Sequence, residues 1–149
     1  DNMMLKSYKD EAGAFLHRKK AADMAKYLIK KLDIATSGIH TPVRMLSGGN
    51  VQKVLLGREI EAGRDVLIVS YPVRGLDINS SYMIYNLLDE ERKRGTAIIF
   101  VGEDLDVLMA LSDRIMVMAD HRIAGITDAR TVTKDYLGSL MTDTKGQVI

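Results

Sequence analysis

The chain has 149 residues, of which 46% are apolar and 28% are charged, and this composition excludes a disordered or collagen-like protein. Lys and Arg number 21 and Asp and Glu 20, so the net charge of +1 provides no global attraction to DNA or anionic lipid. There is no cysteine, which excludes disulfides and thiolate metal sites. No apolar run reaches the roughly 18 residues of a membrane span, and the N-terminus is too polar for a signal peptide, so we expect a soluble domain.

The first part of the chain, residues 1–63, is predicted to be helical. Apolar residues recur at helical spacing over residues 17–32, and lysines and arginines flank them. We interpret this basic flank as a solvated helix face, because Tyr27 is the single aromatic residue in it, and we expect no nucleic-acid partner. A loop follows at 33–44, and a second helix is predicted over 46–62. The apolar stripe of that second helix is predicted to comprise Val51, Val54, Leu55 and Ala62.

The second part, residues 64–141, is predicted to alternate short strands with helices. Two unalternated apolar runs, 66–69 and 97–101, are typical of strands buried on both faces of a parallel sheet. The amphipathic segment 80–94 between them predicts a strand–helix–strand crossover. The last residues, 142–149, are predicted to form a flexible tail.

A hairpin and two helices complete this second part. A short helix is predicted at 104–111, a strand at 114–118 and, after a tight turn, a strand at 122–126. A closing helix is predicted over 131–140. The fold class is therefore α/β, in which a helical subdomain precedes part of a parallel sheet with crossover helices and an edge hairpin.

The run LSGGNVQK, residues 46–53, opens the second predicted helix. Ser47 is a good N-cap residue, and the two glycines let a ligand approach the backbone closely. A helix start offers N–H groups and the positive end of a dipole, so this segment can hold a phosphate. An ordinary capped helix start is the simpler interpretation of the two glycines taken alone.

Two further segments follow the predicted strands and carry carboxylates. The loop 70–77 (SYPVRGLD) ends in Asp77, at the strand end where open parallel sheets bind ligands. An ordinary Pro/Gly loop is the alternative interpretation. The segment 101–106 (VGEDLD) has two interpretations. Its acidic residues have a functional role, or they mark a helix start with Asp104 as the N-cap, and we favour the helix start.

The order of these motifs resembles the C-terminal part of an ABC-transporter ATPase. It is most similar to the second nucleotide-binding half of the tandem ATPases that energise bacterial simple-sugar and nucleoside importers. The resemblance runs from about Met3 to about Met141, and LSGGN-x-QK, RGLD and LSDRI carry it. It implies that the predicted sheet is part of a P-loop-NTPase-type sheet.

The resemblance also implies roles for individual residues. Ser47, Gly48 and Gly49 match the signature motif, which contacts the γ-phosphate of an ATP held by the opposite half of the dimer. Asp77 matches the D-loop, which crosses the dimer interface. No catalytic residue and no metal ligand are predicted. The predicted nucleotide-binding set is Ser47, Gly48, Gly49, Asn50, Gln52 and Asp77.

Three positions depart from the family pattern. Ser70 stands where the family has the Walker B aspartate, and it has no carboxylate for Mg²⁺. Tyr71 stands where the family has the catalytic glutamate, and with a usual pKa of about 10 it would not polarise a water at neutral pH. Glu103 replaces the switch histidine and adds negative charge where a γ-phosphate would lie. We therefore expect this half's own site to be degenerate and catalytically silent.

No Gly-Lys dipeptide occurs in the sequence, so a phosphate loop is absent from these residues. We expect a fragment that alone neither binds nor hydrolyses ATP, and whether it counts as an enzyme is left open. It would supply its signature in trans to Mg-ATP on the N-terminal half of the same polypeptide. Membrane-spanning permease subunits are the other expected partner, at the cytoplasmic face of the inner membrane. The alternative is a non-catalytic α/β interaction or scaffold module with a vestigial signature.

The apolar N-terminal residues have two possible roles. They meet a membrane subunit, as their place in the family implies, or they pack on the chain's own core, which we favour. These residues are Met3, Met4, Leu5 and Tyr8.

Overall fold

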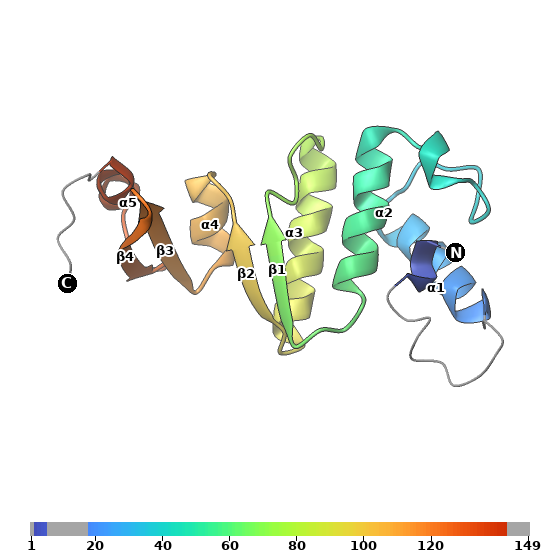
Figure 1. Ribbon diagram of the computed structural model, residues 1–149, viewed down its shortest axis with the longest axis horizontal. Coiled ribbons are helices and arrows are strands. Elements are labelled where there is room, and N and C mark those ends of the chain that lie inside the picture. The colour runs from blue at the N-terminus through green and yellow to red at the C-terminus, as the bar shows by residue number, and fades with distance from the viewer. Residues whose placement is uncertain (1, 6–17, 143–149) are drawn as a thin grey trace. The chain divides into compact units, whose positions relative to one another are not determined.

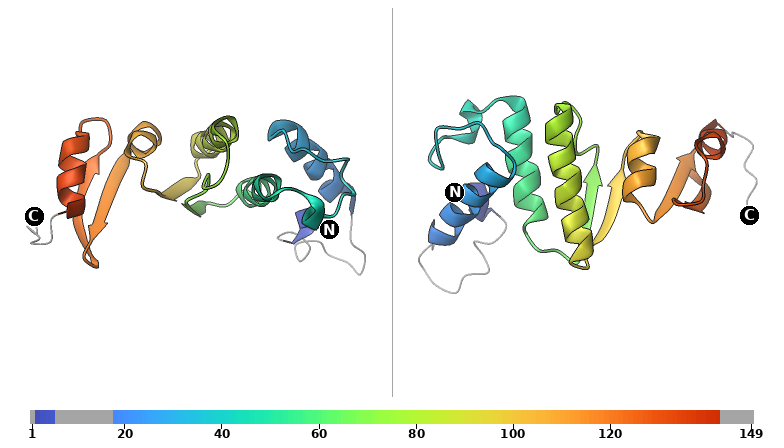
Figure 2. Two further views of the ribbon diagram at one scale, coloured as in Figure 1. Left: turned by 90° about the horizontal axis from the view of Figure 1, so that it is seen from above. Right: turned by 180° about the vertical axis from the view of Figure 1, so that it is seen from behind.

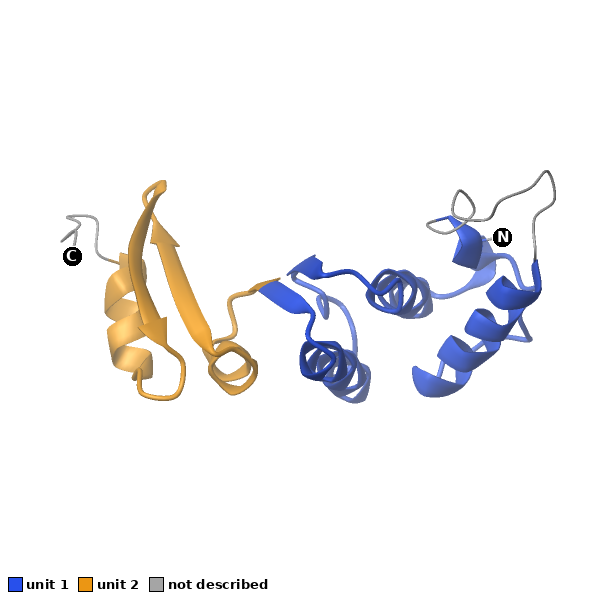
Figure 3. Ribbon diagram, turned by 90° about the horizontal axis from the view of Figure 1, so that it is seen from below, with its two compact units in different colours: residues 1–99 blue, residues 100–149 orange. Residues whose placement is uncertain are grey.

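Helices and short strands alternate along the chain in the computed structural model, which describes residues 2–5 and 18–142. The chain divides into two compact units, residues 1–99 and 100–149, which are described separately (Figure 3). Of the predicted tail 142–149, residues 143–149 lie outside the described residues, as do His17 and Tyr8, whereas Thr142 is the last residue of a helix, so the tail begins one residue later than predicted. The first unit contains η1 (Asn2–Met4), α1 (Arg18–Lys31), η2 (Val43–Met45), α2 (Gly48–Ile60), β1 (Val66–Ser70) and α3 (Ile78–Lys93).

Helices α1 and α2 pack closely because a glycine lies at their contact. Leu28 and Leu32 of the α1 region are fully buried. A Cβ atom at Gly57 of α2 would lie 2.8 Å from Leu28 Cδ2 and 2.8 Å from Leu32 Cδ1. The packing of α1 against α2 fixes the position of α2, and therefore of the LSGG segment at its start.

The buried face of α2 differs from the predicted stripe. Val54 and Ile60 are buried, but Leu55 is 47% exposed, and Lys53 is buried in its place. Each helical residue turns by about 100°, so the face that contains Gly57 includes positions 53, 54 and 60 and excludes 55. The prediction for Leu55 was therefore wrong.

An ion-pair cluster joins three helices of the first unit. Lys31 Nζ donates to Glu90 Oε2 of α3 at 2.6 Å and lies 3.4 Å from Glu61 Oε1 at the end of α2. The Tyr27 hydroxyl accepts from Lys31 at 2.6 Å and donates to Glu61. Burial alone would lower the pKa of Lys31, but its hydrogen bonds to Glu90 and Tyr27 and the charge of Glu61 raise that pKa well above its usual value.

Strands β1 and β2 (Ala97–Val101) form a hydrogen-bonded parallel pair, with α3 alongside it (Figures 1 and 2). Val69 of β1 and Ile84, Leu87 and Leu88 of α3 are buried. The predicted crossover helix and both predicted strands are confirmed.

The prediction that these strands are buried on both faces was wrong for the described chain. Val66 and Ile68 of β1 are 56% and 68% exposed, and Ile99 and Val101 of β2 are also exposed. Strand side chains alternate between two faces, so one covering helix buries only every second residue.

The second unit contains the end of β2 together with α4 (Leu105–Leu111), β3 (Arg114–Ala119), β4 (Arg122–Asp128) and α5 (Lys134–Thr142). Strands β3 and β4 pair antiparallel, as predicted. Asp120 and His121 form their two-residue turn with φ of 49° and 60°, the positive values that a tight hairpin requires. Ile115, Val117, Ala129 and Leu137 form the unit's buried core.

Candidate functional site

The candidate site is the start of α2, where Ser47 is the N-cap residue. Ser47 has an extended backbone (φ −64°, ψ 158°), and its carbonyl accepts the first helical hydrogen bond, from Val51 N at 2.9 Å. The amides of residues 48–50 precede that bond, at the positive end of the helix dipole. In the described part of the chain, the Ser47 side chain is exposed and makes no capping hydrogen bond to the helix.

The two glycines leave the backbone of this helix start open. A Cβ at Gly48 would meet no atom of the described residues within 4 Å. A Cβ at Gly49 would lie in ordinary contact, 3.6 Å from Leu76 Cδ2. Packing within the unit therefore does not demand glycine at either position. Close approach of a ligand to the backbone is a physical reason for both.

Asn50 and Lys53, one turn apart on α2, hold the segment that follows α1. Asn50 Oδ1 accepts from Ala35 N at 3.0 Å, and Lys53 Nζ donates to the Asp33 carbonyl at 3.2 Å. Asn50 also donates from Nδ2 to Ser47 Oγ at 2.9 Å. The sequence pattern indicated none of these three contacts, because a polar residue on an apolar stripe does not reveal which carbonyl, amide or hydroxyl it reaches.

Gln52 joins α2 to the loop after β1. Its Nε2 donates to the Pro72 carbonyl at 2.6 Å. Together with the contact between Gly49 and Leu76, this bond places the LSGG segment beside the loop 70–77. The structure thus brings together two of the motifs that the sequence carries in separate elements.

Asp77 is the N-cap of α3. Its Oδ1 accepts from Ser80 N at 2.9 Å, and its Oδ2 accepts from Ser80 Oγ at 2.5 Å. These two hydrogen bonds lower the pKa of the Asp77 carboxyl from its ordinary value of 3.8. The carboxylate has this structural role whether or not it also meets a nucleotide.

Replacing Asp77 with alanine is expected to lower the Tm of the chain by about 2–4 °C, the effect of one lost helix cap in a chain of this size. Because the pKa of Asp77 is lower in the folded chain, its contribution is present above the unfolded pKa and is lost as the pH falls through the folded value. Thermal melts of wild type, Asp77→Ala and Asp77→Asn over the acidic range measure both effects. Asparagine keeps a cap acceptor without a charge, so equal melts for the two variants would contradict this assignment.

Ser70, Tyr71 and Glu103, which the resemblance aligns with catalytic positions, are exposed. Ser70 ends β1, and Tyr71 follows it with φ of 48°, a left-handed conformation that is uncommon for a bulky residue. Glu103 lies in the second unit, before α4. Asp104 caps α4 by accepting from Asp106 N and Val107 N, which confirms the favoured interpretation of this acidic segment.

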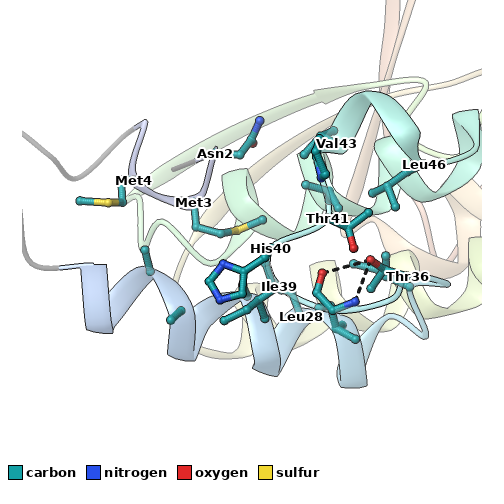
Figure 4. Close-up of a pocket in the computed structure, with 18 of the residues that line it drawn as sticks. Asn2, Met3, Met4, Leu28, Thr36, Ile39, His40, Thr41, Val43 and Leu46 are labelled. Atoms are coloured by element: carbon teal, nitrogen blue, oxygen red, sulfur yellow. Dashed lines mark hydrogen bonds between the residues drawn. The ribbon is translucent and has the colours of Figure 1, made fainter.

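A cavity of about 490 Å³ lies between η1, α1 and the loop that leads to η2 (Figure 4). Met3, Met4, His40 and Thr41 are among its lining residues, and Met4 is buried. Leu5 is exposed. Packing on the chain's own unit therefore accounts for Met4.

Residues 2–5 and 18–142 contain no group of three or more His, Asp or Glu side chains that could hold a metal ion. No helix among them is long and apolar enough to cross a membrane.

Comparison with known proteins relates the chain to the ATP-binding proteins of ABC transporters. No protein-family model matches the chain. The chain is 37% identical to the guanosine import ATP-binding protein NupO of Bacillus subtilis over 144 residues, which is 95% of the chain and 28% of NupO. It is 40% identical to the ribose import ATP-binding protein RbsA of the same organism over 127 residues, 85% of the chain and 26% of RbsA. The dimeric cassette MJ0796, a bacterial ABC transporter cassette, has a TM-score of 0.71 at 20% identity, with 88% of this chain and 56% of the cassette covered.

Over most of its length the chain is homologous to the ATP-binding proteins of ABC importers. Its relatives are named as sugar and nucleoside import ATP-binding proteins, as the resemblance implied. The α/β fold class and the partial P-loop-NTPase-type sheet are confirmed by the solved cassettes. The chain spans little more than a quarter of the length of the curated relatives that it matches.

Proposed function

We propose that this chain is part of the ATP-binding protein of an ABC importer for a simple sugar or a nucleoside. The start of α2 supplies Ser47 and the amides of Gly48 and Gly49 to the γ-phosphate of an ATP held by a partner half. The geometry of this helix start carries the proposal. Ser47 is exposed and is not used for capping, the two glycines leave the backbone open, and a 13-residue helix directs its positive end toward them.

The ATP in this proposal is bound by the N-terminal half of the same polypeptide. The sequence of the chain has no phosphate loop, while its relatives are about four times longer than the part that it matches. Ser70 and Tyr71 lack the carboxylates that hold Mg²⁺ and activate water, so the chain's own site is degenerate. Gln52 and Asp77 position the loop 70–77 at the interface between the halves, and Asn50 supports the signature.

Permease subunits in the membrane are the remaining partners. ATP would hold the two halves together and hydrolysis would release them, so that closure and opening drive the transport cycle. The protein would act at the cytoplasmic face of the inner membrane without crossing it. The similarity of the chain to import ATP-binding proteins supports this assignment.

A calorimetric titration of the 149-residue chain with Mg-ATP tests whether the chain acts only in trans. We expect no binding up to millimolar nucleotide, because the groups at the start of α2 complete a site whose phosphate loop lies elsewhere. Adding the phosphate-loop half is expected to produce saturable binding. Micromolar binding to the chain alone would reveal a nucleotide pocket of its own and would overturn the proposal.

A further inference from the structure

The orientation of the Asn50 amide is determined by its neighbours. A backbone N–H only donates, so the Asn50 atom that faces Ala35 N at 3.0 Å is the carbonyl oxygen. The other end of the amide, Nδ2, therefore faces Ser47 Oγ at 2.9 Å and donates to it. The direction of the second hydrogen bond follows from the first, because one end of the rigid amide group only accepts and the other end only donates.

This arrangement determines what the Ser47 hydroxyl has left to offer. A hydroxyl has one proton and two lone pairs, and the Asn50 bond uses a lone pair. The proton of Ser47 therefore stays available for an acceptor such as a phosphate oxygen. In a common helix start the serine side chain instead accepts from the third helical residue's backbone N–H. Here the third helical residue, Asn50, reaches back with its side chain.

Asn50 is itself held from outside α2. Ala35 follows α1, and Lys53 fixes the same segment through the Asp33 carbonyl at 3.2 Å. Lys53 is buried, and Leu28 and Leu32 pack α1 against Gly57 of α2. A chain of contacts thus runs from the α1–α2 pair through Ala35 and Asn50 to the exposed Ser47.

We propose that Asn50 is a positioning residue, which holds the Ser47 hydroxyl as a hydrogen-bond donor toward the phosphate and does not itself bind the nucleotide. This inference rests on the proposed function, because it concerns the same site. It replaces the expectation that Asn50 is a direct nucleotide ligand.

A double-mutant cycle in the complete ATP-binding protein tests the inference. The ATPase activities of wild type, Ser47→Ala, Asn50→Ala and the double variant are compared at saturating Mg-ATP. Asn50→Ala alone is expected to reduce kcat about 5- to 10-fold, the worth of one oriented neutral hydrogen bond. In the Ser47→Ala background the same change is expected to cost nothing further. An equal loss in both backgrounds would make Asn50 a structural or directly binding residue and would overturn the inference.

Asn50→Asp provides a variant that retains the anchor to Ala35. One carboxylate oxygen still accepts from Ala35 N, while the other becomes an acceptor for the Ser47 proton, so donation to the phosphate is lost. We expect a loss at least as large as that of Ser47→Ala, in a protein with an unchanged urea unfolding curve. Activity near the wild-type level would show that only the Ala35 anchor matters and would overturn the inference.

The design separates this inference from the proposed function. If Ser47→Ala leaves kcat unchanged, the proposed role of Ser47 fails and the positioning role of Asn50 fails with it. If Ser47→Ala is costly but Asn50→Ala costs the same in both backgrounds, only the inference about Asn50 fails.

Discussion

Replacing Ser47 with arginine in the complete ATP-binding protein is expected to reduce its ATPase activity by about 100-fold or more, the cost of removing one preorganised donor from a developing charge. The hydroxyl is lost, and a long side chain enters the open space in front of Gly48. The fold should tolerate the change, because Ser47 is exposed and its side chain does not cap α2. Steady-state hydrolysis of Mg-ATP and a urea unfolding curve measure the two properties separately.

Asn86→Arg is the matched control for this experiment. Asn86 is exposed in the middle of α3, outside the LSGG segment and the loop 70–77, so its replacement adds the same charge and bulk outside the candidate site. We expect near wild-type hydrolysis from this variant. Full activity of the Ser47→Arg protein with normal folding would contradict the proposed function and would favour the scaffold module with a vestigial signature.

Replacing Gly57 with valine is expected to lower the free energy of unfolding of the chain by about 1–3 kcal/mol, the usual cost of overpacking a well-packed contact. A Cβ atom at this position already lies 2.8 Å from two leucine methyl groups, and both leucines are fully buried. This clash is relieved only if α1 moves away from α2. That movement also disturbs the segment after α1, which anchors Asn50. Urea unfolding followed by circular dichroism measures the loss.

Gly138→Val on α5 gives the comparison that isolates the clash. Gly138 also lies in a helix, but a Cβ there meets no atom of the described residues within 4 Å. Its variant should change the free energy of unfolding by less than about 0.5 kcal/mol, through helix propensity alone. Equal effects at the two glycines would show that the α1–α2 contact is not tight.

Local features of the chain were predictable because local chemistry determines them. Apolar spacing placed α1, α2 and α3 within about two residues of their ends, and the apolar runs located β1 and β2. Asp104 was predicted as a cap from its position before a helix, and its hydrogen bonds to two backbone amides confirm it.

The faces of the elements were harder to predict. Leu55 was predicted to be buried and is exposed, while Lys53 is buried, since the face of a helix that packs depends on where its partner approaches. That approach is set by Gly57, whose missing side chain admits two leucines from α1 and the residue after it, Leu28 and Leu32, between about 25 and 30 residues away in sequence. Likewise, the apolar composition of β1 and β2 indicated burial on two faces, whereas Ile68 and Ile99 are exposed in the described chain.

The sequence by itself indicated the similarity to ABC ATPases, the order of helices and strands, and the LSGG segment at the start of α2, because motifs and periodicity are local properties. Only the tertiary structure decided which groups surround Ser47. Its hydroxyl accepts a hydrogen bond from the Asn50 amide, and Asn50 accepts one from the backbone of Ala35, a residue 15 positions from Asn50. A hydrogen bond between distant segments depends on the direction in which each donor points, and that direction exists only once α1 and α2 have packed together.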